Sequence, residues 1–522
     1  MTGFESLLAV LLVALVLAAV ARRVGAPYPA FLALGGAVLA FIPGAPAFSI
    51  DPEVALALFV APALLDAAYD SSPRDLKDLW VPVVSLAVVS VAVTTAAVAV
   101  VARAVVPAMP WAAAVALGAI VSPPDAAAAL AVLKQLRPPH RIVTILSGES
   151  LLNDASGLLI YRLALGAVAM RSFSIGTLAP TLLLVVVGSV LVGIVLAQPV
   201  LWLTSRMRDV PTAIILQFLT TFGVWILADR LGLSSVLTMF CFAVTVARTA
   251  PERIPARLRL PSYAVWETSV FLLNVLAFVF IGLQVRPILA GLDPDVRTQY
   301  IEVAGLVLLT VIVARIAWVL LHSGVVLWKN HIFGFRPTRP GQQPPTFAGS
   351  LVVSWAGMRG IITLAAALAL PVTADGGAFP YRDLIVLTAF AVVIGTLVLQ
   401  GLTLKPLVRA LRLEDDDPVG REVEAARERA LGAALSTIEG DDSPAAEAIR
   451  HEFAAHLKRG SANAERSGVA GWTHEQIHQR AVDAARRAVI DMRTRDNIGD
   501  DAFHRLEEEL DRVEMGIGTG PG

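Results

Sequence analysis

The chain has 522 residues, of which 56% are hydrophobic and only 16% are charged, and its mean hydropathy is +0.69. Soluble domains carry about 25% charged residues, so this composition excludes an ordinary soluble protein. The formal net charge of −1 argues against a nucleic-acid partner. The single cysteine, Cys241, excludes an intramolecular disulfide.

Apolar runs long enough to cross a bilayer recur along the chain as far as residue 410. They predict an all-α membrane protein with about thirteen transmembrane helices, of which the second and third runs are short. The runs cover residues 6–21, 29–44, 53–69, 79–102, 109–134, 142–169, 177–204, 210–229, 232–249, 262–285, 300–327, 348–372 and 382–410.

Basic residues alternate between the connecting loops. The loops after odd-numbered runs are rich in them, as with Arg22 and Arg23 after the first run and Lys405, Arg409 and Arg412 at the last. The loops after even-numbered runs are poorer. Because lysine and arginine mark the cytoplasmic side, the pattern predicts an odd number of spans, an outside N-terminus and a cytoplasmic C-terminus.

The composition changes after Leu413, where Glu-Asp-Asp-Asp-Pro at residues 414–418 forms a charged break and no spanning run follows. We therefore expect a transmembrane domain, 1–413, and a cytoplasmic helical tail, 414–522. Amphipathic patterns predict tail helices, but they do not indicate what the tail does. The patterned segments are 422–439, 443–458, 473–495 and 500–514.

The tail contains His474-Glu475-Gln476-Ile477-His478, which has the spacing of the H-E-x-x-H pattern of zinc proteases. Two histidines four residues apart on a helix could bind a metal. However, the pattern is short, its helix is rich in charge, and spacing marks no third ligand. A solvated helix face explains it as well, and we expect neither a bound metal nor any other cofactor.

The most polar part of an apolar run is Gly-Glu-Ser-Leu-Leu-Asn-Asp at residues 148–154. On a helix, Ser150 and Asp154 share one face, as do Glu149 and Asn153. Ionised groups at bilayer depth are costly and are usually functional. The sequence therefore favours a buried cation or proton site over the alternative, a polar network that only packs helices together.

Two runs contain residues that interrupt helices. The fifth has Ser-Pro-Pro-Asp at residues 122–125, and proline breaks a helix because it lacks the backbone donor and clashes with the preceding turn. The twelfth has Ser-Trp-Ala-Gly-Met-Arg-Gly at residues 354–360. The two runs are each fifth in a block of six, which predicts two inverted six-helix repeats with the ion site at their broken helices. The alternative is that these prolines and glycines serve only to pack helices together.

Further charges lie in the spans: Asp66 in the third run, Arg315 in the eleventh and Arg359 in the twelfth. Charges in a membrane pair with one another, and we expect Arg315 to pair with Glu149, and Arg359 with Asp125. Asp154 would then lack a fixed cationic partner, with Asp66 as a second candidate, and could exchange a proton for a cation. Oxygen ligands suit a hard monovalent cation, whereas a soft metal would require cysteine or histidine.

These segments resemble the sodium/proton exchangers, the electroneutral branch of the monovalent cation/proton antiporters. Residues 148–154 resemble the G-E-S-L-x-N-D signature of that family, and residues 355–360 its W-x-G-L-R-G motif, with Met358 in place of leucine. Residues 274–283 are similar to its N-x-x-x-F-x-x-I-G-L segment. The resemblance covers about residues 6–410, with the three segments in the expected order.

The resemblance implies roles for residues of the site. It implies that Asp154 is the essential ion-binding aspartate, that Ser150 and Asn153 are its neighbours, and that Asp66 is the acidic residue of the third helix. It also implies that Glu149, Arg315 and Arg359 form ion pairs that hold the site together.

One departure from the family concerns the broken fifth helix, where the family usually has Thr-Asp-Pro. Asp125 falls on that aspartate, but Pro124 replaces the threonine and Ala126 the proline. A side-chain hydroxyl is therefore absent, and Ser122 is a candidate to replace it.

The sequence thus predicts an antiporter, not an enzyme, that exchanges sodium or lithium for protons across the inner or plasma membrane by alternating access. Asn153, in place of a second aspartate, suggests one proton per cation and no net charge moved. A potassium/proton antiporter stays open, as does a non-transporting membrane sensor of pH or cations; an intramembrane zinc enzyme is more distant. The resemblance alone implies a homodimer.

Overall fold

The structure is a computed structural model that describes residues 3–24, 27–42, 51–70, 73–133, 136, 138–170, 175–254, 256–292, 294–334, 344–371, 373–374 and 377–413. The chain divides into two compact units, 1–418 and 419–522, and all described residues belong to the first. The predicted tail, with its helices and the pattern at His474 to His478, lies outside the described residues.

The described residues form helices, apart from one antiparallel ribbon in which β1 (Thr373–Ala374) pairs with β2 (Gly377–Ala378). The helices are α1 (Gly3–Val24), α2 (Tyr28–Ala40), α3 (Pro52–Asp70), α4 (Pro73–Asp78), α5 (Trp80–Val84), η1 (Ser85–Ser90), α6 (Val91–Val105), α7 (Trp111–Val121), α8 (Ala126–Leu133), α9 (His140–Met170), α10 (Ile175–Arg206), α11 (Val210–Arg230), α12 (Ser235–Arg253), α13 (Ala256–Leu283), α14 (Val285–Ala290), α15 (Pro294–Phe333), α16 (Phe347–Trp355), α17 (Ile361–Leu368) and α18 (Arg382–Ala410).

Every apolar run predicted from the sequence falls on one of these helices or on consecutive ones. Among the described residues, eight helical segments are long and apolar enough to cross a membrane, and three shorter apolar helices accompany them. Helix α10 shows a surface suited to lipid, because Leu183, Leu184 and Val195 are largely exposed. The protein is therefore a multi-pass membrane protein.

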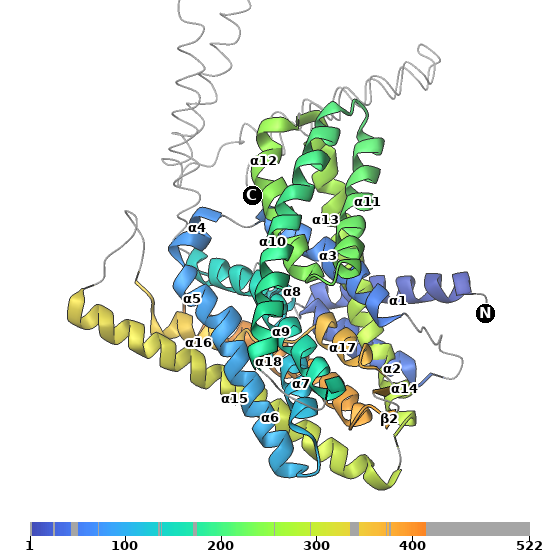
Figure 1. Ribbon diagram of the computed structural model, residues 1–522, viewed down its shortest axis with the longest axis vertical. Helices are drawn as coiled ribbons and strands as arrows, with labels where there is room; N and C mark the ends of the chain where they lie inside the picture. Colours follow the sequence, from blue (N-terminus) through green and yellow to red (C-terminus); the bar gives the residue numbers. More distant parts are fainter. Residues whose placement is uncertain are drawn as a thin grey trace, which may run out of the picture. The chain divides into compact units, whose positions relative to one another are not determined.

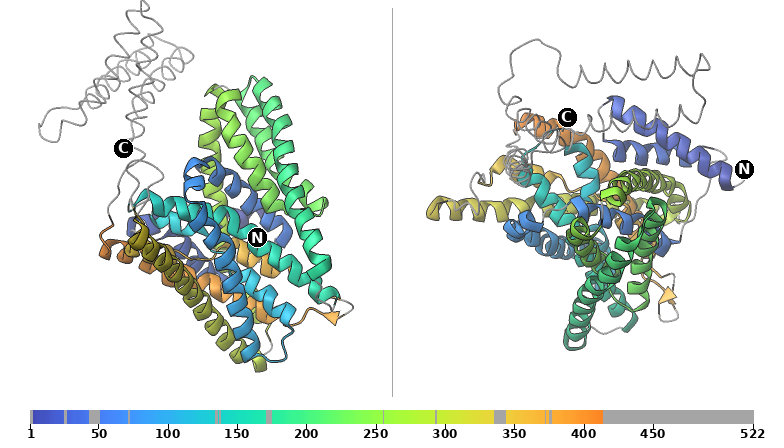
Figure 2. Two further views of the ribbon diagram at one scale, coloured as in Figure 1. Left: turned by 60° about the vertical axis from the view of Figure 1, so that its left-hand side comes forward. Right: turned by 90° about the horizontal axis from the view of Figure 1, so that it is seen from above.

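The helices pack in two groups that the figures distinguish. Helix α12 packs against α3, α10 and α11, and Figure 1 shows α10 to α13 side by side in green. The second group places α6 against α7, α7 against α9, and α15 against α6, α16 and α18. Figure 2 shows the same two groups from other directions. The acidic residues at 148–154 lie on α9, which contacts helices of both groups.

Helices α2 and α13 cross at backbone contact. A Cβ atom on Gly282 would lie 2.2 Å from the Ala33 carbonyl oxygen, and one on Gly36 would lie 2.4 Å from that of Val279. Small residues allow this close approach in membranes. Phe278, in the segment 274–283, also meets Tyr28 edge to face. This segment therefore packs α13 against α2.

A single π-helical turn, η1, joins α5 to α6. Its first residue, Ser85, accepts a hydrogen bond from the Trp318 indole N–H at 3.2 Å, and its hydroxyl lies 3.1 Å from Nδ1 of His322. Trp318 and His322 fall on the same face of α15 as Arg315, at spacings of three and seven residues. These contacts fix the position of α15 against η1.

Helix starts at the surface are capped by polar side chains. Asp209 accepts a hydrogen bond from the Thr212 backbone N–H at 2.9 Å at the start of α11, and the hydrogen bonds from Thr212 hold the pKa of that carboxylate below its usual value. Ser234 and Thr346 cap α12 and α16 in the same way.

Candidate functional site

Both predicted interruptions are present, and the two broken helices meet there. Residues 122–125 separate α7 from α8, and residues 356–360 separate α16 from α17. The backbone N–H of Asp125 donates to the Met358 carbonyl oxygen at 2.6 Å. Extended backbone from two distant parts of the chain thus forms one crossing, with helix ends on every side of it.

Arg359 satisfies carbonyl groups that the interrupted helices leave free. Its Nε donates to the Val121 carbonyl oxygen at 3.0 Å and its Nη2 to that of Ser122 at 3.1 Å, while Nη1 donates to the Gly357 carbonyl oxygen. The C-terminal end of α7 carries partial negative charge, so a cation is favourable there.

The predicted ion pair between Arg359 and Asp125 is therefore absent among the described residues, and this prediction is wrong. The guanidinium is directed at backbone carbonyls because a broken helix ends beside it. Arg359 is also held through its backbone N–H, which donates to the Thr396 hydroxyl of α18 at 3.0 Å.

Asp125 lies at the opposite kind of helix end. Its Oδ1 accepts from the Ala127 backbone N–H at 2.9 Å, which makes it the cap of α8. Its Oδ2 faces Gly360, the residue that precedes α17, and a Cβ atom there would lie only 1.8 Å from that oxygen. The carboxylate thus lies near two helix N-termini, which carry partial positive charge.

Glu149 and Arg315 form a buried ion pair. Nη1 and Nη2 of Arg315 donate to Oε1 and Oε2 of Glu149 at 2.5 and 2.9 Å, and each residue is 1% exposed. Nη2 also donates to the Val353 carbonyl oxygen at 3.1 Å, which ties α9 and α15 to α16. A Cβ atom on Gly357 would lie 2.4 Å from the Arg315 side chain, so the break at residues 356–360 also makes room for this arginine.

Asn153 faces the interruption between α7 and α8. The Asn153 amide Nδ2 donates to the Pro124 carbonyl oxygen at 2.7 Å, and Gly157, one turn further on, packs against the Pro123 ring. Asn153 Oδ1 is buried without a hydrogen-bond partner in the described structure. α9 is thereby held against the break at the level of Asp154.

The Asp154 carboxylate is 7% exposed and forms no hydrogen bond or ion pair with the described residues. It lies close enough to Asp125 for the two carboxylates to interact electrostatically. Ser150, one turn before it on α9, is partly buried. A desolvated carboxylate without an ion pair is a group that can take up a proton or a cation.

The remaining predicted residues flank this site. Asp66 is partly buried on α3, which packs against α9 and α17. The Ser122 hydroxyl donates to the Gly118 carbonyl oxygen at 2.6 Å and lies 3.0 Å from the Thr95 hydroxyl of α6. Thr95 and Thr396 were missed in the sequence analysis; their only signal is a hydroxyl in an apolar run.

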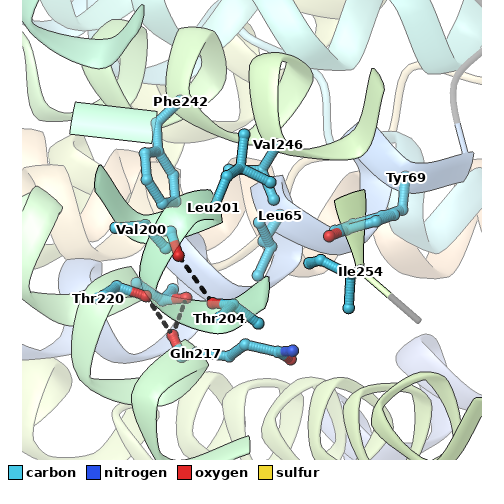
Figure 3. Close-up of a pocket in the computed structure, with 11 residues that line it drawn as sticks. Leu65, Tyr69, Val200, Leu201, Thr204, Gln217, Thr220, Phe242, Val246 and Ile254 are labelled. Atoms are coloured by element: carbon cyan, nitrogen blue, oxygen red, sulfur yellow. Dashed lines mark hydrogen bonds between the residues drawn. The ribbon is translucent and has the colours of Figure 1, made fainter. Parts of the chain in front are cut away.

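A separate pocket lies between α3, α10, α11 and α12 (Figure 3), and no residue of the predicted site lines it. Its threonine hydroxyls are satisfied by their own helices: Thr204 donates to the Val200 carbonyl oxygen at 2.8 Å and Thr221 to that of Gln217 at 2.7 Å. Within the described residues, no group of three or more His, Cys, Asp or Glu side chains could hold a metal ion.

A family model described as "Sodium/hydrogen exchanger, transmembrane" matches residues 9–410. The chain belongs to this family. It is a family of membrane transporters, so the protein is not an enzyme.

Individual relatives agree with this assignment. The chain is 32% identical to a Mycobacterium tuberculosis protein named as an uncharacterized Na(+)/H(+) exchanger, over 97% of this chain and 95% of that protein. It is 30% identical to the "Sodium, potassium, lithium and rubidium/H(+) antiporter" of Bacillus pumilus, over 77% of this chain, and it spans 61% of that relative's length. The solved sodium proton antiporter of Methanocaldococcus jannaschii at pH 8 shares the fold, with a TM-score of 0.62 and 18% identity over 78% of this chain and 98% of that one.

Proposed function

We propose that this protein is a secondary transporter that exchanges sodium for protons across the cell membrane. Membership of the sodium/hydrogen exchanger family supports this function. The observation that carries the proposal at the level of residues is Asp154, a buried carboxylate without a hydrogen bond or ion pair among the described residues. In a transporter of this chemistry such a group binds a proton or a cation, but not both at once.

The charges around the crossing support an electroneutral exchange. Glu149 and Arg315 neutralise each other, and the opposite charges of Asp125 and Arg359 stabilise opposite helix ends. Asp154 then provides the negative charge that one monovalent cation or one proton balances. Asn153 cannot ionise, so it adds no second proton to the cycle.

The cation ligands we assign are oxygen atoms around Asp154. They are the Asp154 carboxylate, the free Asn153 Oδ1 and the Ser150 hydroxyl, with Asp125 and Asp66 contributing charge nearby. Carboxylate, amide and hydroxyl oxygens suit hard cations such as sodium. No resident cofactor is needed, since the ions themselves are the substrates.

Alternating access places further demands on the fold. We propose thirteen spans arranged as two inverted six-helix repeats around the seventh, with the broken fifth and twelfth spans at the ion site. The distribution of basic loop residues supports an N-terminus on the outside of the membrane. It also supports a cytoplasmic position for the end of the transmembrane domain and for the tail. We also propose a homodimer, as the resemblance to the family implies.

A broader cation selectivity is the second candidate. The name of the Bacillus pumilus relative includes potassium, lithium and rubidium besides sodium, and oxygen ligands alone do not exclude the larger ions. The test is a proton flux assay in proteoliposomes with each cation in turn. Exchange with sodium supports the proposal, exchange with potassium alone identifies a potassium/proton antiporter, and no exchange with any cation favours the sensor.

A further inference from the structure

Gln400 on α18 has no role in the site described above. Its side chain is 0% exposed, and neither its Nε2 nor its Oε1 has a hydrogen-bond partner in the described structure. Leaving a buried amide unsatisfied is costly, and such groups usually bind a water molecule or an ion. Gln217, the comparable glutamine of α11, has both atoms satisfied: Oε1 accepts from the Trp266 indole N–H at 2.6 Å, and Nε2 donates to the Ser262 hydroxyl at 3.3 Å.

The neighbours of Gln400 on its helix show which way it faces. Thr396, four residues earlier, accepts the hydrogen bond from the Arg359 backbone N–H, and Thr403, three residues later, accepts one from the Trp355 indole N–H at 2.8 Å. Residues four before and three after share one face of a helix. Gln400 therefore faces the end of α16 and the extended segment that follows it.

The end of α16 is attractive to cations. A helix C-terminus carries partial negative charge and leaves carbonyl groups without intrahelical partners. The Val353 carbonyl oxygen is held by Arg315, whereas those of Ser354 and Trp355 accept no hydrogen bond from the described residues. The free Oε1 of Gln400 adds another acceptor on the same side.

The position of Gln400 along α18 places it next to the crossing. Four residues of helix separate it from Thr396, which is about 6 Å along the axis. Side chains on a helix lean toward its N-terminus, which for Gln400 is the direction of Thr396 and of the Arg359 backbone bound to it. From this level α18 continues to Ala410, beside the basic loop residues that predict the cytoplasmic face.

We propose that Gln400 Oε1 and the free carbonyl groups at the end of α16 form a second binding station for the transported monovalent cation, between the Asp154 site and the cytoplasmic side. The inference rests on the proposed exchange function. The station replaces water ligands of the cation before it reaches Asp154 and so determines how readily the cation binds from that side.

The test compares Gln400→Met with Gln217→Met in the full-length protein. Methionine keeps the length of glutamine but removes its amide. Proteoliposome flux gives the half-saturating sodium concentration, and melting curves of the purified protein with and without sodium give the stabilisation by the cation. We expect Gln400→Met to raise the half-saturating sodium concentration about tenfold, because the cation loses one contact with the amide oxygen. We also expect it to reduce the sodium-dependent rise in melting temperature. Gln217→Met should leave both at their wild-type values.

An unchanged sodium dependence in Gln400→Met overturns the proposal, since the amide would then hold only water. Equal shifts in both variants also overturn it, because they would reflect loss of packing. If Gln400→Met does not fold, Gln400→Glu serves instead: a carboxylate should lower the half-saturating sodium concentration, and an unchanged value refutes the station. A wild-type protein that exchanges no sodium refutes the exchange function itself.

Discussion

Replacing Arg315 with alanine should destabilise the protein because it leaves Glu149 charged and buried. The pair is bidentate, at 2.5 and 2.9 Å, and each residue is only 1% exposed. Breaking such a pair from one side typically costs about 3–5 kcal/mol. Arg315→Ala also frees the Val353 carbonyl oxygen, so we expect it to be at least as damaging as Glu149→Ala.

The double variant should recover part of this loss, because neither charge then lacks its partner. For groups in direct contact the interaction energy is about 0.5–3 kcal/mol. Equilibrium unfolding in mixed micelles, measured for wild type, both single variants and the double variant, gives this coupling energy directly. Additive effects of the two single substitutions would refute the reasoning.

The control is an ion pair whose side chains are exposed. Arg162 Nη2 lies 3.2 Å from Asp229 Oδ1, but these side chains are 44% and 53% exposed. Exposed pairs contribute about 0–1 kcal/mol, so Asp229→Ala should change the unfolding free energy little. A loss as large as that of Glu149→Ala would mean that burial does not explain the cost.

Three further predictions concern the crossing. Asp154→Asn should abolish sodium-driven proton flux in proteoliposomes yet leave the melting temperature near that of wild type; substantial flux at normal expression contradicts the assignment. Wild-type flux should not respond to an imposed membrane potential, and a steep rise with potential would mean that unequal charges are exchanged. Gly360→Ala should lower both flux and melting temperature, because the new Cβ atom would collide with the Asp125 carboxylate. Gly305→Ala should be neutral, because a Cβ atom there meets nothing within 4 Å. Equal effects of the two substitutions would show that the contact between Gly360 and Asp125 is unimportant.

The sequence predicted the apolar helices well because the bilayer demands long apolar segments. Their ends were less certain for α15, which extends over Pro294–Phe333, well beyond the apolar run 300–327. Polar residues continue this helix at both ends, where apolar content no longer marks it. Helix α3, by contrast, begins and ends within a residue of its predicted run.

The site was predictable where side chains pair with side chains, and not where they bind backbone. Arg315 and Glu149 are the expected partners because both charges lie in spans and each needs the other. The partners of Arg359 are carbonyl groups that exist only because α7 ends at Val121. The sequence shows that prolines break the helix. It does not show which side chain donates hydrogen bonds to the carbonyl groups that the break leaves free.

The helix ends also explain how the chain tolerates Pro124 where the family usually has threonine. Proline offers no hydroxyl, but its carbonyl oxygen is held by Asn153, so the residue still connects the break to α9. The Ser122 hydroxyl is engaged with Gly118 and Thr95 and therefore braces α7 against α6. Because the Arg359 guanidinium is committed to the carbonyl groups at the end of α7, it is not free to neutralise Asp154. That leaves the Asp154 carboxylate as the group whose charge changes when an ion or a proton arrives.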